Sequence, residues 1–589
     1  MGQRVYVGLL GFYFFIYSLA HFPSIETWSG FYGMTFGLLH PGSFPGDLSG
    51  NYHPIMVSLQ ALLVKTVGGD LWLDERFQLL WWMGIIAASV IGVHYIMRLM
   101  GVTSYWAKLV IWAVIMGHHL FVANIPRVID LVCFRPTTYT GPFIIWLSYF
   151  LLKGNSFWPI MLLMVIGIAV SVKTMWLWAV VAIIFLFKEY GRFSFRKIVA
   201  LVGGGLTIVF VGNYYWQYFH GSLQTNTLLF DSAKEFENSE ANPMVNGLGP
   251  YILMIFVGLG CWFRWPEKIL TMRWRWIMGV FLVMYVMGTI YYSFSPDFLK
   301  IPFFVALSLN RSSWWFQVLL FMFLTVRLLN AIEQTSSRQR WFPILGLVVL
   351  FFFPFVEYEF LNNFPHMPFQ FDKHILFKAP VFLGLWLGGW IVYQISKVLE
   401  NKVTAYVKIF QPRHILYAAM IGTMICSVLF KLYENKEYLR FLFRYGIMGC
   451  SPSAKWIGVN EFFRNETNPN STILAMAGRP LELDSALKIR TGRTMPYGHH
   501  RGFFYFDLNK QRINQQINDT IAPLPRYWQS CDIENIQRIL GFLHDPDYIV
   551  VPDEQLCSPE KIGYGYIKTI NHFSIWKKYL NTTQLKHNP

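Results

Sequence analysis

Apolar runs separated by polar connections fill the chain up to residue 431. Such runs can cross the ~30 Å hydrocarbon core of a bilayer as helices. The stretch from Gly141 to Phe187 is broken only at Lys153-Gly154-Asn155 and Ser171-Val172-Lys173, which predicts three short helices there. The pattern predicts about thirteen spans, at 5–20, 79–99, 106–123, 141–152, 157–171, 173–187, 198–215, 250–263, 276–294, 313–331, 341–357, 380–397 and 414–431. We therefore expect a polytopic α-helical membrane protein.

The charges that flank these runs predict an orientation, because basic residues collect in cytoplasmic connections. With the N-terminus inside, the inner connections hold Arg98, Lys108, Lys153, Lys188, Arg192, Arg264, Lys268, Arg273, Arg275, Arg338, Arg340, Lys397 and Arg413. The outer connections then hold most of the acids, including Asp47, Asp74, Glu75, Asp231, Glu235, Asp297, Glu359 and Asp372. We predict a multi-pass protein of a bacterial inner (plasma) membrane with a cytoplasmic N-terminus.

The pattern changes after the last run. Strand-like pieces lie at 472–477, 503–507, 548–551, 566–570 and 572–576, and helical patterns lie at 454–463 and 533–543. An odd number of spans places this region outside the cytoplasm. We predict a transmembrane domain over 1–431 with a functional first outer loop at 21–78, followed by an extracytoplasmic α/β domain over 432–589.

Composition agrees with a membrane protein. Of the 589 residues, 54% are hydrophobic and only 14% are charged. The formal net charge of +16 is spread over short connections and does not form a patch, so we expect no nucleic-acid partner. Cys450, Cys531 and Cys557 lie in the C-terminal region. Three cysteines fix no framework, and the pair favoured for a disulfide is Cys531 with Cys557.

Asp47 is the first candidate for chemistry. It lies in the loop after the first span, among Pro45, Gly46 and Gly50. A lone carboxylate held just off the membrane face is suited to act as a general base. The alternative is that Asp47 caps a helix beginning near His53 or solvates a turn.

Basic residues recur at span ends on the same outer side as Asp47. Arg127 and Arg135 follow the third span, Lys173 lies at an outer turn, and Arg311 opens the tenth span. Guanidinium and ammonium groups at such places suit a lipid phosphate, and they would stabilise the charge on a leaving phosphate. The alternative is that each cation extends from a helix end to the lipid headgroups. We assign supporting or acceptor-binding roles to His53 and Asp130.

Several other chemistries lack their motifs. The sequence contains no phosphate-binding glycine loop, no cysteine pairs at zinc spacing and no serine nucleophile elbow. His118-His119 has no third ligand at useful spacing. We expect no metal site and no cofactor, and a divalent metal is not indicated.

The layout resembles the GT-C superfamily of polytopic membrane glycosyltransferases. Asp47 occupies the first outer loop, where that superfamily keeps its catalytic acid. Arg135-Pro136 precedes a short helical pair and Ser171-Val172-Lys173 opens the next span, as in several bacterial branches. The outer α/β domain is also shared, and Pro546-Asp547-Tyr548-Ile549-Val550-Val551 is similar to its late strand. Many members pair two acids in the first loop, whereas Asp47 stands alone.

The C-terminal region is also similar to a group of bacterial membrane proteins with a helix, a strand and an arginine. The matching segments are 456–464, 471–477 and Arg490-Thr491-Gly492-Arg493. On this resemblance we assign a supporting or acceptor-binding role to Arg493. The resemblance to the GT-C superfamily implies an inverting transfer of sugar from a polyprenyl-phosphate donor to a glycan, lipid or protein acceptor of the envelope. The membrane lipids are further partners. A transporter or non-catalytic assembly factor for envelope glycans or lipids is the rival hypothesis.

Overall fold

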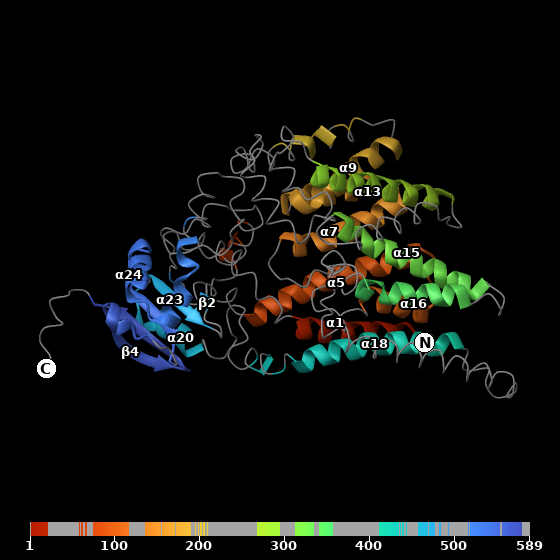
Figure 1. The fold of residues 1–589 in the computed structure, drawn as a ribbon. Coiled ribbons are helices and arrows are strands. Elements are labelled where there is room, and N and C mark those ends of the chain that lie inside the picture. The colour runs from red at the N-terminus through yellow and green to blue at the C-terminus, as the bar shows by residue number, and fades with distance from the viewer. Residues whose placement is uncertain are drawn as a thin grey trace, which may run out of the picture.

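Helices make up most of the described chain, and one small sheet follows them (Figure 1). The computed structural model describes, besides a few single residues, the ranges 2–21, 75–116, 136–154, 156–170, 172–189, 268–294, 312–334, 341–356, 412–434, 457–477 without 469, 482–483, 519–553 and 557–579.

The helices coincide with predicted apolar runs. They are α1 (Gln3–His21), α5 (Glu75–Leu99), α6 (Tyr105–Met116), α7 (Pro136–Lys153), α8 (Phe157–Val170), α9 (Val172–Glu189), α13 (Lys268–Phe294), α15 (Ser312–Gln334), α16 (Trp341–Val356) and α18 (Pro412–Glu434). Each predicted run in the described ranges is therefore confirmed as a helix. The runs at 198–215, 250–263 and 380–397 lie wholly or mostly outside the described residues.

Both predicted breaks between residues 141 and 187 are confirmed. α7 ends at Lys153, and Gly154 follows with φ +70°, a left-handed conformation that glycine adopts without strain. α8 then ends at Val170 and α9 begins at Val172. Three helices therefore pack consecutively, α7 on α8 and α8 on α9, with short connections.

Ring contacts fix the relative directions of the first helices. α1 and α6 run the same way, because the ring centroids of Tyr6 and Tyr105 lie 5.2 Å apart and those of Phe14 and Trp112 lie 5.0 Å apart. α5 runs the opposite way, since His94 near its end meets Tyr6 near the start of α1. The reversal from helix to helix is the one that the predicted topology requires.

α7 runs parallel to α5. Trp146 Nε1 donates to the carbonyl oxygen of Ala88 over 3.2 Å, and the rings of Tyr95 and Tyr149 lie 5.8 Å apart. The end of α7 meets the start of α13, where Arg273 Nη1 donates to the carbonyl oxygen of Lys153 over 2.8 Å. The sequence places Lys153 and Arg273 in connections on one side, and the structure brings these two connections together.

α6 lies at the centre of the helical part. It packs against α15, α16 and α18, and all its residues from Lys108 to Met116 are buried. One continuous hydrophobic cluster extends from Tyr6 to Leu439. Among the described residues, only the segment Leu79–Leu99 of α5 is long and apolar enough by itself to cross a membrane. Tyr105–Met116, Phe157–Val170 and Leu416–Cys426 are shorter apolar segments.

A five-stranded sheet forms the C-terminal part, in the order β2-β1-β3-β5-β4. Its strands are β1 (Ile473–Ala477), β2 (Glu482–Leu483), β3 (Tyr548–Pro552), β4 (Tyr564–Ile570) and β5 (Phe573–Lys578). β1 and β3 pair in parallel, and the other neighbours pair antiparallel. Four predicted strands are thus confirmed, the one at 503–507 lies outside the described residues, and β2 was not predicted.

Helices pack on this sheet and give it a core of its own. They are α20 (Ile457–Glu466), α23 (Leu524–Ser530), α24 (Ile533–Phe542) and the 3-10 turn η10 (Pro559–Ile562). Their buried cluster runs from Val459 to Ile575 and is separate from the helical cluster that ends at Leu439. The predicted domain boundary after residue 431 falls in the last turn of α18, which continues to Glu434. Figure 1 shows the sheet beyond the ends of the long helices, on the side away from the N-terminus.

Candidate functional site

Most residues of the predicted catalytic and donor site lie outside the described residues. These are Asp47, His53, Arg127, Asp130, Arg135 and Arg311. Lys173 is the second residue of α9, and its backbone is described. Their roles therefore stay predictions, and the structure contributes the frame around them.

In the sequence, the predicted cations come immediately before a described helix or in its first turn. Arg135 directly precedes α7, Arg311 directly precedes α15, and Lys173 lies in the first turn of α9. Because α7, α8 and α9 reverse direction in turn, α7 and α9 begin at the same end of the bundle. A helix N-terminus carries partial positive charge and unpaired backbone N–H groups, which favour anions. The starts of α7 and α9 therefore suit the same kind of ligand, while the phosphate-binding roles of Arg135 and Lys173 stay predictions.

Arg493 is the one predicted site residue whose side chain is described. Its guanidinium lies at the end of α20, where Nη2 donates to the carbonyl oxygens of Phe463 and Thr467 over 2.5 and 2.9 Å. Nε donates to Thr467 Oγ1 over 3.0 Å. Burial lowers the pKa of Arg493. These contacts cap the C-terminal end of α20 and connect the helix to the predicted arginine segment, while the acceptor role of Arg493 stays a prediction.

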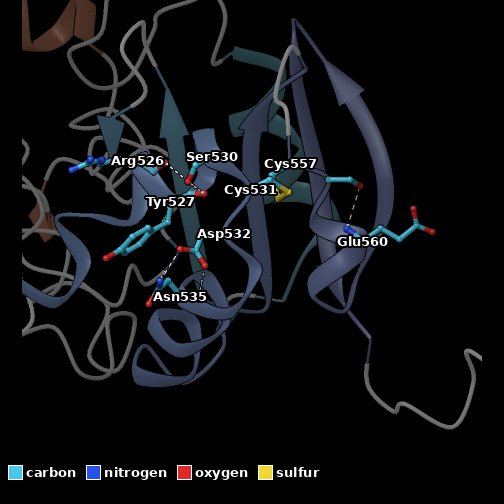
Figure 2. The surroundings of a disulfide bond; sticks show 9 residues. Arg526, Tyr527, Ser530, Cys531, Asp532, Asn535, Cys557 and Glu560 are labelled. Carbon is cyan, nitrogen blue, oxygen red and sulfur yellow. Dashed lines mark hydrogen bonds between the residues drawn. A yellow bond between two sulfur atoms is a disulfide. The ribbon is translucent and has the colours of Figure 1, made fainter.

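A disulfide joins Cys531 and Cys557, whose Cα atoms are 4.8 Å apart (Figure 2). The favoured pairing is therefore confirmed. Cys531 is the C-cap of α23 in a left-handed conformation, and Asp532 is the N-cap of α24. Asn535 donates to Asp532 from its side chain (2.7 Å) and its backbone N–H (3.2 Å), and these bonds hold the pKa of the carboxyl below its usual value.

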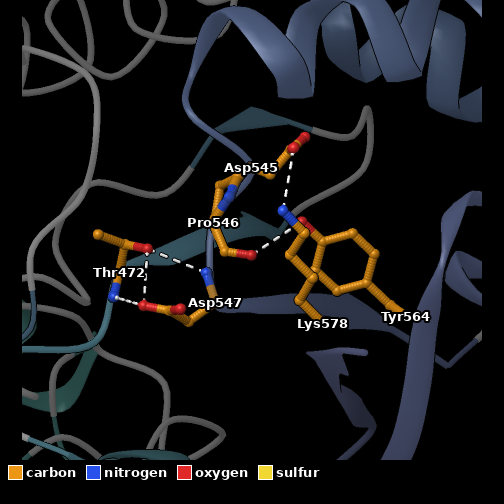
Figure 3. Close-up of polar contacts among 6 residues, drawn as sticks. All are labelled: Thr472, Asp545, Pro546, Asp547, Tyr564 and Lys578. Carbon is orange, nitrogen blue, oxygen red and sulfur yellow. Dashed lines mark hydrogen bonds and ion pairs between the residues drawn. The ribbon is translucent and has the colours of Figure 1, made fainter. Parts of the chain in front are cut away.

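The loop before β3 carries a second polar network (Figure 3). Asp547 and Thr472 bond to each other, Lys578 Nζ lies 3.0 Å from Asp545 Oδ2, and the Tyr564 hydroxyl donates to the carbonyl oxygen of Pro546 over 2.8 Å. Burial raises the pKa of Tyr564, and Asp545 and Asp547 raise it further. The phenol therefore stays neutral and serves as a donor. This network lies at the start of β3, the strand that is similar to the late strand of the GT-C outer domain.

Two polar groupings were not predicted from the sequence. Asp553, just after β3, accepts hydrogen bonds from Thr569 and Ser574. In the helical part, Tyr6, His94 and Trp112 make polar contacts across three helices, with Lys108 beside them. Each grouping combines residues that are far apart in the chain, so no local motif reports it.

The described residues contain no group of three or more His, Cys, Asp or Glu side chains that could hold a metal ion. Comparison with known proteins adds no assignment: no protein-family model, no curated protein and no solved structure matches the chain.

Proposed function

We propose that the chain is a polytopic membrane glycosyltransferase that moves a sugar from a polyprenyl-phosphate donor to an envelope acceptor on the outer membrane face. The observation that carries the membrane part is the exposed side of α5. Leu80, Gly84, Ala87, Ile91 and Tyr95 follow each other at helical spacing, and all five are exposed. Water would be a poor solvent for such a stripe, whereas lipid accommodates it.

Charged residues bound this stripe. Arg76 and Arg98 are exposed on the same side of α5, one at each end. At 1.5 Å per residue the helix between them is about 33 Å long, which is close to the ~30 Å of a hydrocarbon core. Arginines at both ends would reach the two headgroup layers. α8 also has an exposed apolar stripe, formed by Trp158, Leu162 and Ile166, but this stripe is shorter and has no charged residues at its ends.

The disulfide supports the outer placement of the C-terminal domain, because disulfides persist in oxidising compartments and are rare in the cytosol. Together with the alternating helix directions, it favours a cytoplasmic N-terminus. The first loop, which contains Asp47, then lies on the same side as the C-terminal domain.

The chemistry rests on the sequence and on the helix starts. In the proposed reaction Asp47 takes the proton of an acceptor hydroxyl. The acceptor oxygen bonds to the anomeric carbon from the face opposite the phosphate, and the bond from that carbon to the phosphate oxygen breaks. The lipid phosphate leaves with the electron pair and is stabilised by Arg127, Arg135, Lys173 and Arg311. The configuration inverts in this single displacement.

The test is transfer and binding by the purified full-length protein with a panel of short polyprenyl-phosphate hexoses. We expect Asp47→Asn to lower turnover by about 10²-fold or more, and Asp74→Asn, in the same loop, to keep it. Arg311→Ala should weaken donor binding, whereas Arg338→Ala, in a predicted inner connection, should not. Normal transfer by Asp47→Asn would refute the assigned base. Donor binding without turnover, for every acceptor tried, would favour the transporter or assembly factor.

A further inference from the structure

Three helices meet at the buried phenol of Tyr6. The Tyr6 side chain is 1% exposed, accepts a hydrogen bond from Trp112 Nε1 of α6 over 3.3 Å, and lies 3.4 Å from His94 Nδ1 of α5. Its ring centroid is 5.2 Å from that of Tyr105. The ends of α1, α5 and α6 that meet here are those on the side of the N-terminus.

Lys108 projects onto this cluster. The residue is 5% exposed, and its Nζ lies 4.9 Å from the ring centroid of Tyr105 and 5.9 Å from that of Tyr6. Within the part of the chain that the structure describes, no carboxylate forms an ion pair with Lys108. A second cation, Arg98, lies in the last turn of α5, and only the short connection 100–104 separates this turn from the start of α6, which contains Lys108. The tyrosine rings replace only part of the lost hydration of the ammonium group, so the two cations favour an anion beside them.

The surface next to these cations indicates what kind of anion fits. Arg98 ends the exposed stripe of α5, directly after Ile91 and Tyr95 at helical spacing. A ligand placed there meets apolar surface along α5 and positive charge at its end. Free phosphate would contact only the positive charge, whereas an anionic lipid would contact both the positive charge and the apolar surface.

We propose that Lys108 and Arg98 bind the phosphate group of an anionic phospholipid whose acyl chains lie along the exposed face of α5. The inference rests on the membrane insertion in the proposed function and not on glycosyl transfer. With a cytoplasmic N-terminus, the lipid belongs to the inner leaflet. It is distinct from the donor lipid, which the predicted site binds at the opposite ends of the helices.

The test measures lipid retained by the detergent-purified full-length protein, by native mass spectrometry. The probes are phosphatidylglycerol and phosphatidylcholine of equal chain length, with inorganic phosphate as competitor. We expect phosphatidylglycerol to be preferred, and Lys108→Gln or Arg98→Gln to lower its retention about fivefold each. Lys108→Arg should keep the preference, which separates loss of charge from loss of fold.

Lys153→Gln is the matched control. Lys153 is the last residue of α7, whereas Lys108 lies in the first turn of α6, but both lie at the same end of the bundle and over a tyrosine. The Lys153 Nζ lies 5.7 Å from the Tyr149 ring centroid, and Lys153 is exposed. Its replacement should leave phosphatidylglycerol retention unchanged. Equal retention of the two lipids, equal loss in Lys153→Gln, or displacement by inorganic phosphate would each overturn the proposal. Flotation with liposomes is measured first: a protein that does not float refutes membrane insertion, whereas one that floats without headgroup preference refutes only the lipid site.

Discussion

Asp547 and Thr472 bond to each other reciprocally across 75 positions of the chain. The Asp547 carboxylate accepts from the Thr472 backbone N–H over 2.8 Å and from its hydroxyl over 3.1 Å, and the same hydroxyl accepts from the Asp547 backbone N–H over 2.9 Å. The pair therefore aligns the starts of the two parallel strands, β1 and β3. This register places Tyr548, Ile549 and Val550 opposite Ile473, Leu474 and Ala475.

Replacing Asp547 with Ala should loosen this alignment. Asp547 is exposed and Thr472 is half-buried, so water replaces part of what is lost, and we expect a cost of about 1 kcal/mol. Amide hydrogen exchange of the β1 and β3 peptides in the full-length protein should therefore accelerate. Glu461→Ala is the control, because Glu461 is an exposed acid of α20 in the same domain. Equal exchange in the two variants would show that the pair does not hold the strands.

The sequence predicted the elements better than their ends. α13 begins at Lys268 although its apolar run begins at residue 276, because the helix continues through Arg273 and Arg275. α7 begins at Pro136 although the run begins at residue 141. Proline suits a first helical position, and charged residues can lie in a helix, so run length locates only the apolar part.

Short elements, and sites built from residues of several helices, could not be predicted from the sequence. β2 has two residues, and α23 has seven with little apolar periodicity, so neither gives a pattern. The Tyr6, His94 and Lys108 cluster comes from three helices and is defined by packing alone. The sequence did predict the helix, strand and arginine segments of the C-terminal domain, but it did not reveal that Arg493 caps α20.

Two roles of Arg493 can be separated by conservative replacement. Arg493→Met should destabilise the C-terminal domain by about 2 kcal/mol, because the buried carbonyl oxygens at the end of α20 lose a charged donor. Arg493→Lys should recover part of the lost stability, since a single ammonium group cannot make all the hydrogen bonds of the planar guanidinium group. Hydrogen exchange at α20 and sugar transfer are measured on both variants. Native protection in Arg493→Lys together with lost transfer would instead support acceptor binding.

Loss of the disulfide should destabilise the same domain. The bridge spans a sequence separation of 26 residues, for which the chain-entropy model gives about 3.5 kcal/mol. We expect the double replacement of Cys531 and Cys557 by Ser to lower the denaturant concentration at which α24 and β3 lose protection. Cys426→Ser is the control, because Cys426 is a free cysteine in α18. Native protection in the double variant would contradict a stabilising bridge.

Acid should weaken the start of α24 through Asp532. Its folded pKa lies below the ordinary value of 3.8 because Asn535 donates to the ionised form. The stabilisation is therefore complete above 3.8 and is lost as the pH falls through the lower, folded pKa. Asp532→Asn, which can still cap the helix, should show a smaller loss of α24 protection between neutral and acidic pH. Identical acid sensitivity in the two proteins would refute the contribution of Asp532.

The junction of α7 and α13 gives the sharpest test of the helical packing. Gly154 has φ +70°, and a Cβ atom there would collide with the guanidinium of Arg273. In Gly154→Ala the guanidinium has to move away and lose its hydrogen bonds to the carbonyl oxygens of Leu152 and Lys153. We therefore expect this loss to add to the roughly 1 kcal/mol of backbone strain. Thermal unfolding of the full-length protein measures this, and Gly279→Ala, where the added methyl group meets open space in α13, is the control.

A double-mutant cycle separates the two causes. In an Arg273→Ala background the collision disappears while the positive φ remains, so Gly154→Ala should cost less there than in the wild type. Arg273→Ala alone should also destabilise, because the carbonyl oxygens of Leu152 and Lys153 lose their charged donor. Strict additivity of the two replacements would mean that Arg273 does not lie over Gly154. The contact that joins the two connections predicted on the cytoplasmic side would then be wrong, and the end of α7 would not meet the start of α13 as described.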